Sequence, residues 1–285
     1  MLRSMTGFGL GRAEATGLQV TAEIRSVNGR FLKVSIKAPS ALSNRETELE
    51  ALLRERLKRG SVNLTVHVKH TDPARLAKVN SEAALAYKAA FERLGLPTQV
   101  IGLLPGVLDN ATSEELPESE WVAIVQAVRQ ALAQLAQMRE REGGALAVEL
   151  LAICDRLEAV RSTVLERAPV VVQEYRQKLS TRLSLLLDAG TAGVDRDLVA
   201  REVAVFADRC DVAEELMRLK AHLDQVQGLV NSGDDVGRRL DFLSQEMLRE
   251  ANTIGSKSAD GALAHAVIEL KSLIEQVKEQ VANVE

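Results

Sequence analysis

The sequence is poor in aromatic residues, which make up 3% of its 285 residues, and it contains no long apolar run. Because few aromatic side chains are available, the core must be built from aliphatic side chains. The apolar stretches fall far short of the roughly 18 residues that a membrane span needs, and the first residues show no apolar signal region. With 46% hydrophobic residues, the chain can still bury one or two cores. These features predict a folded cytoplasmic protein without a membrane partner.

Cysteines are scarce, and several common catalytic motifs are missing. Cys154 and Cys210 lie far apart in helical patterns, without the paired spacing of a metal site, so we expect two buried thiols. The sequence has no Gly-x-x-x-x-Gly-Lys-Ser/Thr phosphate loop, no Gly-x-Gly-x-x-Gly between a strand and a helix, no nucleophile elbow and no His-Glu-x-x-His helix. These absences remove the support for nucleotide triphosphatases, Rossmann enzymes and the common hydrolases.

The net charge is −4, but it is unevenly distributed along the chain. Residues 1–37 contain six basic residues against two acidic ones, and the basic residues are Arg3, Arg12, Arg25, Arg30, Lys33 and Lys37. Residues 109–128 contain acidic residues and no Lys or Arg. A basic N-terminal part beside acidic helical material suits a polyanion that is held on one surface and repelled from another. Simple solvation of these charges is the alternative interpretation.

The first 70 residues show the pattern of a small α+β module. Apolar and polar residues alternate at 18–24, 32–36 and 62–68, which predicts three half-buried strands. A helix is expected over residues 44–58, with Gly60 ending it. We expect turns with positive φ at two places in this part: Gly7, Gly9 and Gly11 near the chain start, and Asn28 with Gly29 between strands.

From about residue 81 onward, apolar residues recur at intervals of three and four, which is typical of long paired helices. Breaks are expected at 71–80, 102–118, 189–195 and 231–235. The predicted fold class is α+β: a small N-terminal β-rich α+β module followed by a large, elongated all-helical region with long paired helices. We divide the chain into an N-terminal module (1–75), a helical middle region with coiled-coil-like helices (76–195) and a C-terminal helical module carrying the candidate active site (196–285). Narrow apolar faces on several helices favour a homo-oligomer.

Two predicted C-terminal helices carry a stripe of residues that suit a cation. The stripe on the first helix steps by four, three and four residues: Asp211, Glu215, Arg218 and His222. In the next helix, Glu246 and Glu250 are one turn apart, and a short connection would fold this helix back against the first. Several carboxylate oxygens with one imidazole suit Mn²⁺, Mg²⁺ or Zn²⁺. Interhelical salt bridges among the same residues are the alternative.

Groups that bind phosphate occur in two parts of the chain. Near the start, Arg3 precedes a Gly-rich stretch, and Arg25, Asn28 and Arg30 surround a predicted turn. In the stretch 237–258, apolar residues form one narrow helix face and the remaining surface mixes guanidinium, carboxylate and amide groups. Because few aromatic residues lie among the basic N-terminal ones, we expect base stacking to be a minor contribution.

Several long motifs make the sequence similar to a known family. They are RSMTGFG at 3–9, RSVNGRFL at 25–32, RGSV at 59–62, LPGVL at 104–108, DVAEEL at 211–216 with Arg218, Leu219 and His222, the stretch 237–258, and ELK at 269–271 followed by IEQ at 274–276. Together they resemble the YicC/YloC family of bacterial proteins. The resemblance covers both ends of the chain, whereas residues 72–200 resemble the family mainly in layout.

The resemblance implies a divalent-metal-dependent endoribonuclease that assembles as a hexamer with a basic inner surface. On this basis, metal binding and acid-base catalysis are assigned to Glu215, His222, Glu246 and Glu250. The expected RNA-binding residues are Arg3, Arg25, Asn28, Arg30, Arg238, Arg239, Arg249 and Lys257. The expected cofactor is Mn²⁺ or Mg²⁺, with Zn²⁺ as a further candidate, and the expected partners are RNA, further copies of the chain and other RNA-degrading enzymes. The alternatives are a non-catalytic RNA clamp or adaptor that presents RNA to another nuclease, and a helical scaffold that does not bind RNA.

Overall fold

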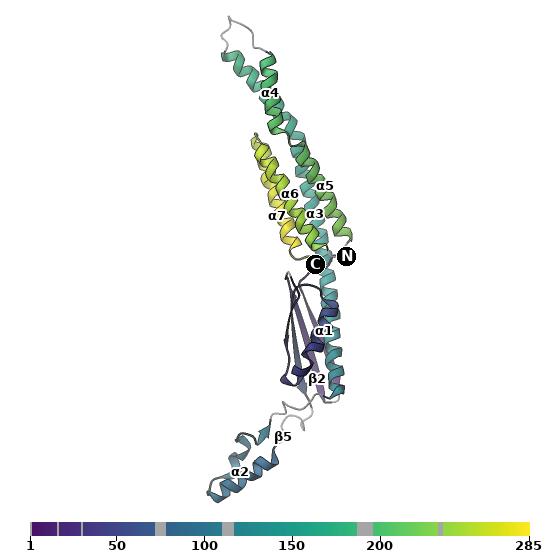
Figure 1. The fold of residues 1–285 in the computed structure, drawn as a ribbon, viewed down its shortest axis with the longest axis vertical. Coiled ribbons are helices and arrows are strands. Elements are labelled where there is room, and N and C mark those ends of the chain that lie inside the picture. Colours follow the sequence, from purple (N-terminus) through teal and green to yellow (C-terminus); the bar gives the residue numbers. More distant parts are fainter. Residues whose placement is uncertain are drawn as a thin grey trace. The chain divides into compact units, whose positions relative to one another are not determined.

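Figure 1 shows a computed structural model of the chain, which describes residues 2–15, 17–29, 31–71, 78–109, 117–186, 196–232 and 236–285. The chain forms two compact units. We call Met5–Arg139 the N-terminal unit, and Met1–Ser4 together with Glu140–Glu285 the C-terminal unit. The N-terminal unit contains a four-stranded sheet and the C-terminal unit is mainly helical, so the α+β fold class is confirmed. These units group residues by contact in space, so they do not test the three-part division along the chain, which stays a prediction.

The sheet of the N-terminal unit has the strand order β1-β2-β4-β3. Its strands are β1 (Gly7–Ala15), β2 (Leu18–Val27), β3 (Lys33–Lys37) and β4 (Ser61–His70). β2 pairs antiparallel with both β1 and β4, whereas β3 pairs parallel with β4. A short 3-10 helix, η1 (Ser40–Arg45), and the helix α1 (Glu46–Arg56) connect β3 to β4. The three strands predicted from alternation are therefore confirmed as β2, β3 and β4.

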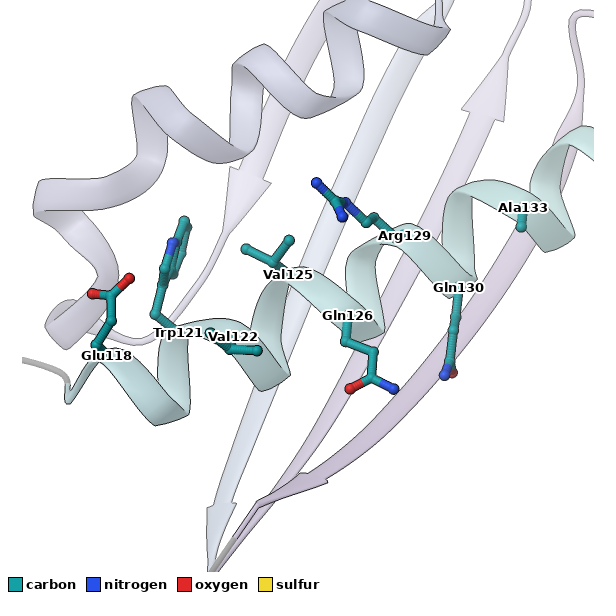
Figure 2. Close-up of a pocket in the computed structure, with 8 residues that line it drawn as sticks. All are labelled: Glu118, Trp121, Val122, Val125, Gln126, Arg129, Gln130 and Ala133. Atoms are coloured by element: carbon teal, nitrogen blue, oxygen red, sulfur yellow. The ribbon is translucent and has the colours of Figure 1, made fainter.

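The strand β1 was not expected, because its glycines were interpreted as turn residues. Gly9 and Gly11 lie within β1, where an added Cβ would come within 2.0 Å and 1.8 Å of the backbone oxygens of Ala131 and Ala127. Glycine therefore allows the helix α3 (Glu118–Leu186) to lie directly against this strand. The helix α3 also supplies a hydrogen-bond partner for the backbone at the edge strand β1. The backbone N–H of Arg12 donates to the side-chain oxygen of Gln130, which points toward the strand in Figure 2.

Positive φ angles occur at other glycines than those predicted. In the described residues they are found at Gly17, Gly60, Gly95 and Gly106, and not at Gly7, Gly9, Gly11 or Gly29. Gly60 does not cap α1 either, because this helix ends at Arg56 with Leu57 as an extended C-cap. The φ of 102° at Gly60 instead belongs to the turn that leads into β4.

One face of the sheet is covered by α1 and by the first part of α3, which lie on the same side of the strands in Figure 2. The core between them is aliphatic apart from Trp121, as the composition predicted. Its fully buried members come from the strands, from α1 and from α3, and they include Ala22, Ile24, Leu64, Leu49, Leu53, Ile124 and Leu135. Burial of this face stabilises the unit mainly through apolar area removed from water.

Residues 78–109 form a small part of the N-terminal unit that has little core. It consists of α2 (Ser81–Arg93), the 3-10 helix η3 (Thr98–Leu103) and a two-stranded pairing of β5 (Lys78–Val79) with β6 (Leu108–Asp109). No residue of α2 is buried, and several large apolar side chains of this part are exposed: Leu85, Leu94, Leu96, Val100 and Leu103.

The C-terminal unit packs the rest of α3 with α4 (Arg196–Cys210), α5 (Ala213–Ser232), α6 (Gly237–Lys257) and α7 (Gly261–Val281). Its core joins the predicted aliphatic faces of these helices, and α3 continues through Pro169. Cys154 is fully buried, and burial raises the pKa of its thiol to about 11, whereas Cys210 is only half-buried. Among the described helices, none is both long and apolar enough to span a membrane.

Candidate metal centre

The candidate site lies on the helix pair α5 and α6 of the C-terminal unit. Each helix buries one apolar face, which includes Leu219 and Leu223 in α5 and Leu243 and Met247 in α6. Lys257 at the end of α6 donates to the backbone oxygen of Asp211, two residues before the start of α5, at 2.8 Å. The two helices therefore run antiparallel, and the polar residues that flank their apolar faces come together.

Three of the four predicted ligands meet. One donor atom each from His222 of α5 and from Glu246 and Glu250 of α6 lie within 4.8 Å of one another. A divalent ion with ligand bonds of about 2.1 Å holds tetrahedral donors about 3.4 Å apart, so small side-chain rotations suffice to close the cluster around an ion. His222 Nδ1 is buried without a hydrogen-bond partner in the part of the chain that the structure describes. The imidazole therefore has a free nitrogen, as a metal ligand requires.

Among the described residues, the cationic neighbours of the two carboxylates in the cluster lie beyond hydrogen-bond distance. Glu250 is 4% exposed, and its Oε1 lies 3.8 Å from the guanidinium of Arg218. Glu246 is half-buried and lies 3.8 Å from the guanidinium of Arg249. Both distances exceed that of a hydrogen bond, so the two carboxylates keep oxygen lone pairs for another ligand. The same contacts are the observation that favours the salt-bridge alternative.

Glu215, the fourth predicted ligand, is engaged elsewhere. Its Oε1 accepts a hydrogen bond from the ammonium of Lys257 at 2.7 Å, and it is not part of the three-residue cluster. Burial alone would raise the pKa of Glu215, but the Lys257 ammonium and a backbone hydrogen bond lower it further than burial raises it. Glu215 is therefore an ionised, paired carboxylate. Its other carboxylate oxygen, Oε2, is buried without a hydrogen-bond partner among the described residues, but Glu215 lies outside the three-residue cluster.

The predicted RNA-binding residues are distributed over both units. In the C-terminal unit, Arg238, Arg239 and Arg249 are exposed on α6, and exposed Arg3 pairs with Glu140 at 3.2 Å. Lys257 is half-buried against Glu215. The N-terminal unit contributes the exposed residues Arg25 and Asn28, while Arg30 lies outside the described residues.

A surface hollow in the N-terminal unit is a weaker candidate for chemistry. It runs along α3 and is lined by the residues labelled in Figure 2, among them Trp121, Val122 and Val125. Glu118 at one end is held by Arg45 at 2.8 Å, and the Arg45 guanidinium also stacks over the ring of Trp121. None of the predicted site residues lines this hollow. The helix pair α5 and α6 remains the better candidate.

Two models of known families match the chain, one in each half. A family model described as the N-terminal region of the YicC-like endoribonucleases matches residues 2–148, and one described as their C-terminal part matches residues 164–285. This chain belongs to the YicC-like family. The predicted family resemblance is thereby confirmed.

Curated relatives match the YicC-like chain over its full length. A protein of Clostridioides difficile (strain 630) named "Probable endoribonuclease YicC" is 33% identical over 294 residues, which cover all of both chains. A protein of Haemophilus influenzae with the same name is 30% identical over 303 residues, again covering all of both chains. The cluster of His222, Glu246 and Glu250 lies inside the segment that matches the C-terminal YicC-like model.

The site contains one residue, Arg218, to which the sequence pattern gives no role. Arg218 belongs to the same stripe as Glu215 and His222, and its guanidinium contacts Glu214 in its own helix and approaches Glu250 from α5. The Glu214 contact follows from the four-residue spacing, whereas the approach to Glu250 depends on how α6 packs against α5. The sequence spacing therefore predicts the contact of Arg218 with Glu214 but not its approach to Glu250.

Proposed function

We propose that this protein is a divalent-metal-dependent endoribonuclease with its cation site at His222, Glu246 and Glu250. The convergence of these three donors from two helices is the observation that carries the proposal. The names of the relatives, which describe probable endoribonucleases, support RNA as the substrate. Mn²⁺ and Mg²⁺ suit the two carboxylates, and the imidazole is also compatible with Zn²⁺.

The donor set fits a catalytic site rather than a structural one. Three protein ligands leave coordination positions open, whereas structural sites are usually closed by a fourth. A bound divalent cation would supply positive charge for a phosphoryl oxygen and lower the pKa of a water molecule. In this proposal, the carboxylate oxygen of Glu246 that does not bind the cation would accept a proton. The guanidiniums of Arg218 and Arg249, which lie 3.8 Å from the two carboxylates, would receive phosphate oxygens.

The remaining predicted residues have supporting roles in this proposal. Glu215 holds the Lys257 ammonium through its Oε1, and we assign it to positioning. The other residues proposed to contact RNA are Arg3, Arg25, Asn28, Arg30, Arg238 and Arg239. Arginine suits this task because its planar guanidinium binds phosphate through two parallel hydrogen bonds.

We also propose that the protein works as a homo-oligomer, with six copies as the state that the family resemblance implies. The exposed apolar side chains of residues 78–109 support this proposal, because a part of a protein with so little core gains stability from a covering partner. Light scattering on the protein used for activity assays measures the copy number.

Metal removal tests the proposed activity. Purified protein with a labelled single-stranded RNA should show cleavage in Mn²⁺, lose it in EDTA by about 10²-fold or more, and regain it when Mn²⁺ is added in excess. The matched control is the same RNA and protein in EDTA followed by Ca²⁺, which binds oxygen ligands at longer distances. Retention of RNA without cleavage in any metal would favour the non-catalytic clamp or adaptor, and no retention at low salt would favour the helical scaffold.

A further inference from the structure

The second face of the sheet in the N-terminal unit is open. Side chains of a strand point alternately to opposite faces. The set that includes Val20, Ala22 and Ile24 in β2 is buried beneath α1 and α3. The opposite set, which includes Arg25 and Val27, is not buried in any of the four strands as far as the structure describes them.

The open face is basic and polar. It carries five basic side chains, which are Arg12, Arg25, Lys33, Lys37 and Lys69, against the two acidic residues Glu14 and Glu23. Glu23 lies 3.9 Å from Arg25, which is too long for a hydrogen bond, and the Arg25 side chain is 70% exposed. The excess of positive charge is therefore available to an anionic partner.

Flat and polar groups form rows across the strands of this face. In the row nearest the start of β1, Phe8 lies opposite Arg25, which lies opposite Asn63, which in turn pairs with Ser35. The Arg25 guanidinium stands over the Phe8 ring at 5.6 Å from its centre, and Phe8 is 36% exposed. Two rows further on, Arg12, Thr21 and His67 form a similar sequence of a guanidinium, a hydroxyl and an imidazole.

We infer that this open face of β1, β2, β4 and β3 binds a segment of single-stranded RNA, an inference that rests on the proposed function and names the surface that holds the substrate. Three kinds of group needed for such binding are present on one surface: cations for phosphates, amides and hydroxyls for base edges and 2′-hydroxyls, and flat groups for stacking. Four strands about 4.8 Å apart give a surface about 14 Å wide, which accommodates one strand of RNA.

The composition of the face argues for RNA rather than a protein partner. The centres of protein interfaces are depleted in charge and enriched in large apolar anchors. Here Phe8, Leu10 and Val27 are the large apolar side chains on a face whose other described residues are polar or charged. Unpaired bases are favoured over a duplex, because flat side chains stack on bases that are free of their own partners.

Two sets of variants of the full-length protein test the inference. The first is Arg12→Ala/Lys37→Ala/Lys69→Ala, with Arg56→Ala/Lys58→Ala/Lys88→Ala as a control that removes the same charge from exposed positions in or near α1 and α2. The second is Phe8→Ala, with Phe8→Trp as a control that keeps an aromatic ring. Affinity for a fluorescent RNA of about 12 nucleotides, single-stranded or in a duplex, is measured in EDTA at several salt concentrations.

We expect the triple variant of the face to bind single-stranded RNA about 10- to 50-fold more weakly at about 0.15 M salt, with a salt slope smaller by about 2. The affinity of Phe8→Ala for single-stranded RNA should be about tenfold lower than that of the wild type. Phe8→Trp and the charge control should bind this RNA with the wild-type affinity. The variants of the face should also lose less affinity for the duplex RNA than for the single-stranded RNA.

The possible failures are distinguishable. Equal affinities of the face variant and the charge control, in a protein that still cleaves RNA, would overturn the inference and leave the proposed function intact. A face variant with unchanged affinity and an altered mass in light scattering would identify the face as a contact between copies and also overturn the inference. A wild-type protein that neither binds nor cleaves RNA would overturn the proposed function and the inference together.

Discussion

Glu246→Gln and Glu250→Gln should each lower the rate of RNA cleavage by about 10²- to 10⁴-fold, which is the range expected when a metal ligand or a proton acceptor is lost. The amide has nearly the shape of the carboxylate, so the packing of α6 is preserved while the negative charge is removed. Single-turnover cleavage of a labelled RNA in saturating Mn²⁺ measures the effect, and RNA affinity in EDTA should change little.

A matched control separates this effect from a general loss of charge or fold. Glu279→Gln removes the same charge from an exposed position in α7 and should cleave RNA at the wild-type rate. The free energy of unfolding of both cluster variants should lie within about 1 kcal/mol of the wild-type value. The reason is that the Arg218 and Arg249 side chains, which lose their carboxylate neighbours, are largely exposed to water. Normal turnover by both cluster variants, in preparations freed of contaminating nuclease, would show that catalysis does not use these carboxylates.

Gly9→Ala and Gly11→Ala should each destabilise the N-terminal unit by about 3 kcal/mol. An added Cβ would meet backbone oxygens of α3 at 2.0 Å and 1.8 Å, and these atoms cannot move aside as the end of a flexible side chain could. To accept a methyl group, α3 must therefore separate from β1, which loses core contacts along both elements.

The loss of stability in the two glycine variants is measured by chemical denaturation, with tryptophan fluorescence as the signal. Trp121 is the single tryptophan of the chain and is buried in the core of the N-terminal unit, so its emission reports on that unit. Gly102→Ala is the matched control, because an added Cβ there meets nothing within 4 Å. A Gly9→Ala protein with the same denaturation midpoint as the Gly102→Ala protein would contradict the close contact between β1 and α3.

The elements that the sequence predicted correctly are those with a clear apolar period. β2 alternates strictly between buried and less buried residues, β4 does so over residues 61–67, and the helices of the C-terminal unit keep steps of three and four. β1 was missed because alternating glycines give no apolar signal, although their spacing of two residues matches the period of a strand. Their role depends on a helix more than 100 residues further along the chain, which no local pattern reveals.

For the candidate site, the sequence predicted which residues share a helix face but not the register between the two helices. Helical spacing placed His222 on one stripe and Glu246 with Glu250 on another, and the short connection between the helices indicated that the stripes would meet. The register between the helices could not be derived in the same way. In the observed register, Lys257 lies opposite Glu215 and neutralises it, so the cluster contains three of the four predicted ligands.

The most direct test of the central proposal is a crystal structure of the protein soaked in Mn²⁺, with anomalous scattering data collected at the manganese absorption edge. The proposal predicts a peak about 2.2 Å from an imidazole nitrogen of His222 and from carboxylate oxygens of Glu246 and Glu250. It would be contradicted by a map without a peak between these side chains at saturating Mn²⁺, in which Arg218 and Arg249 bind the two carboxylates directly.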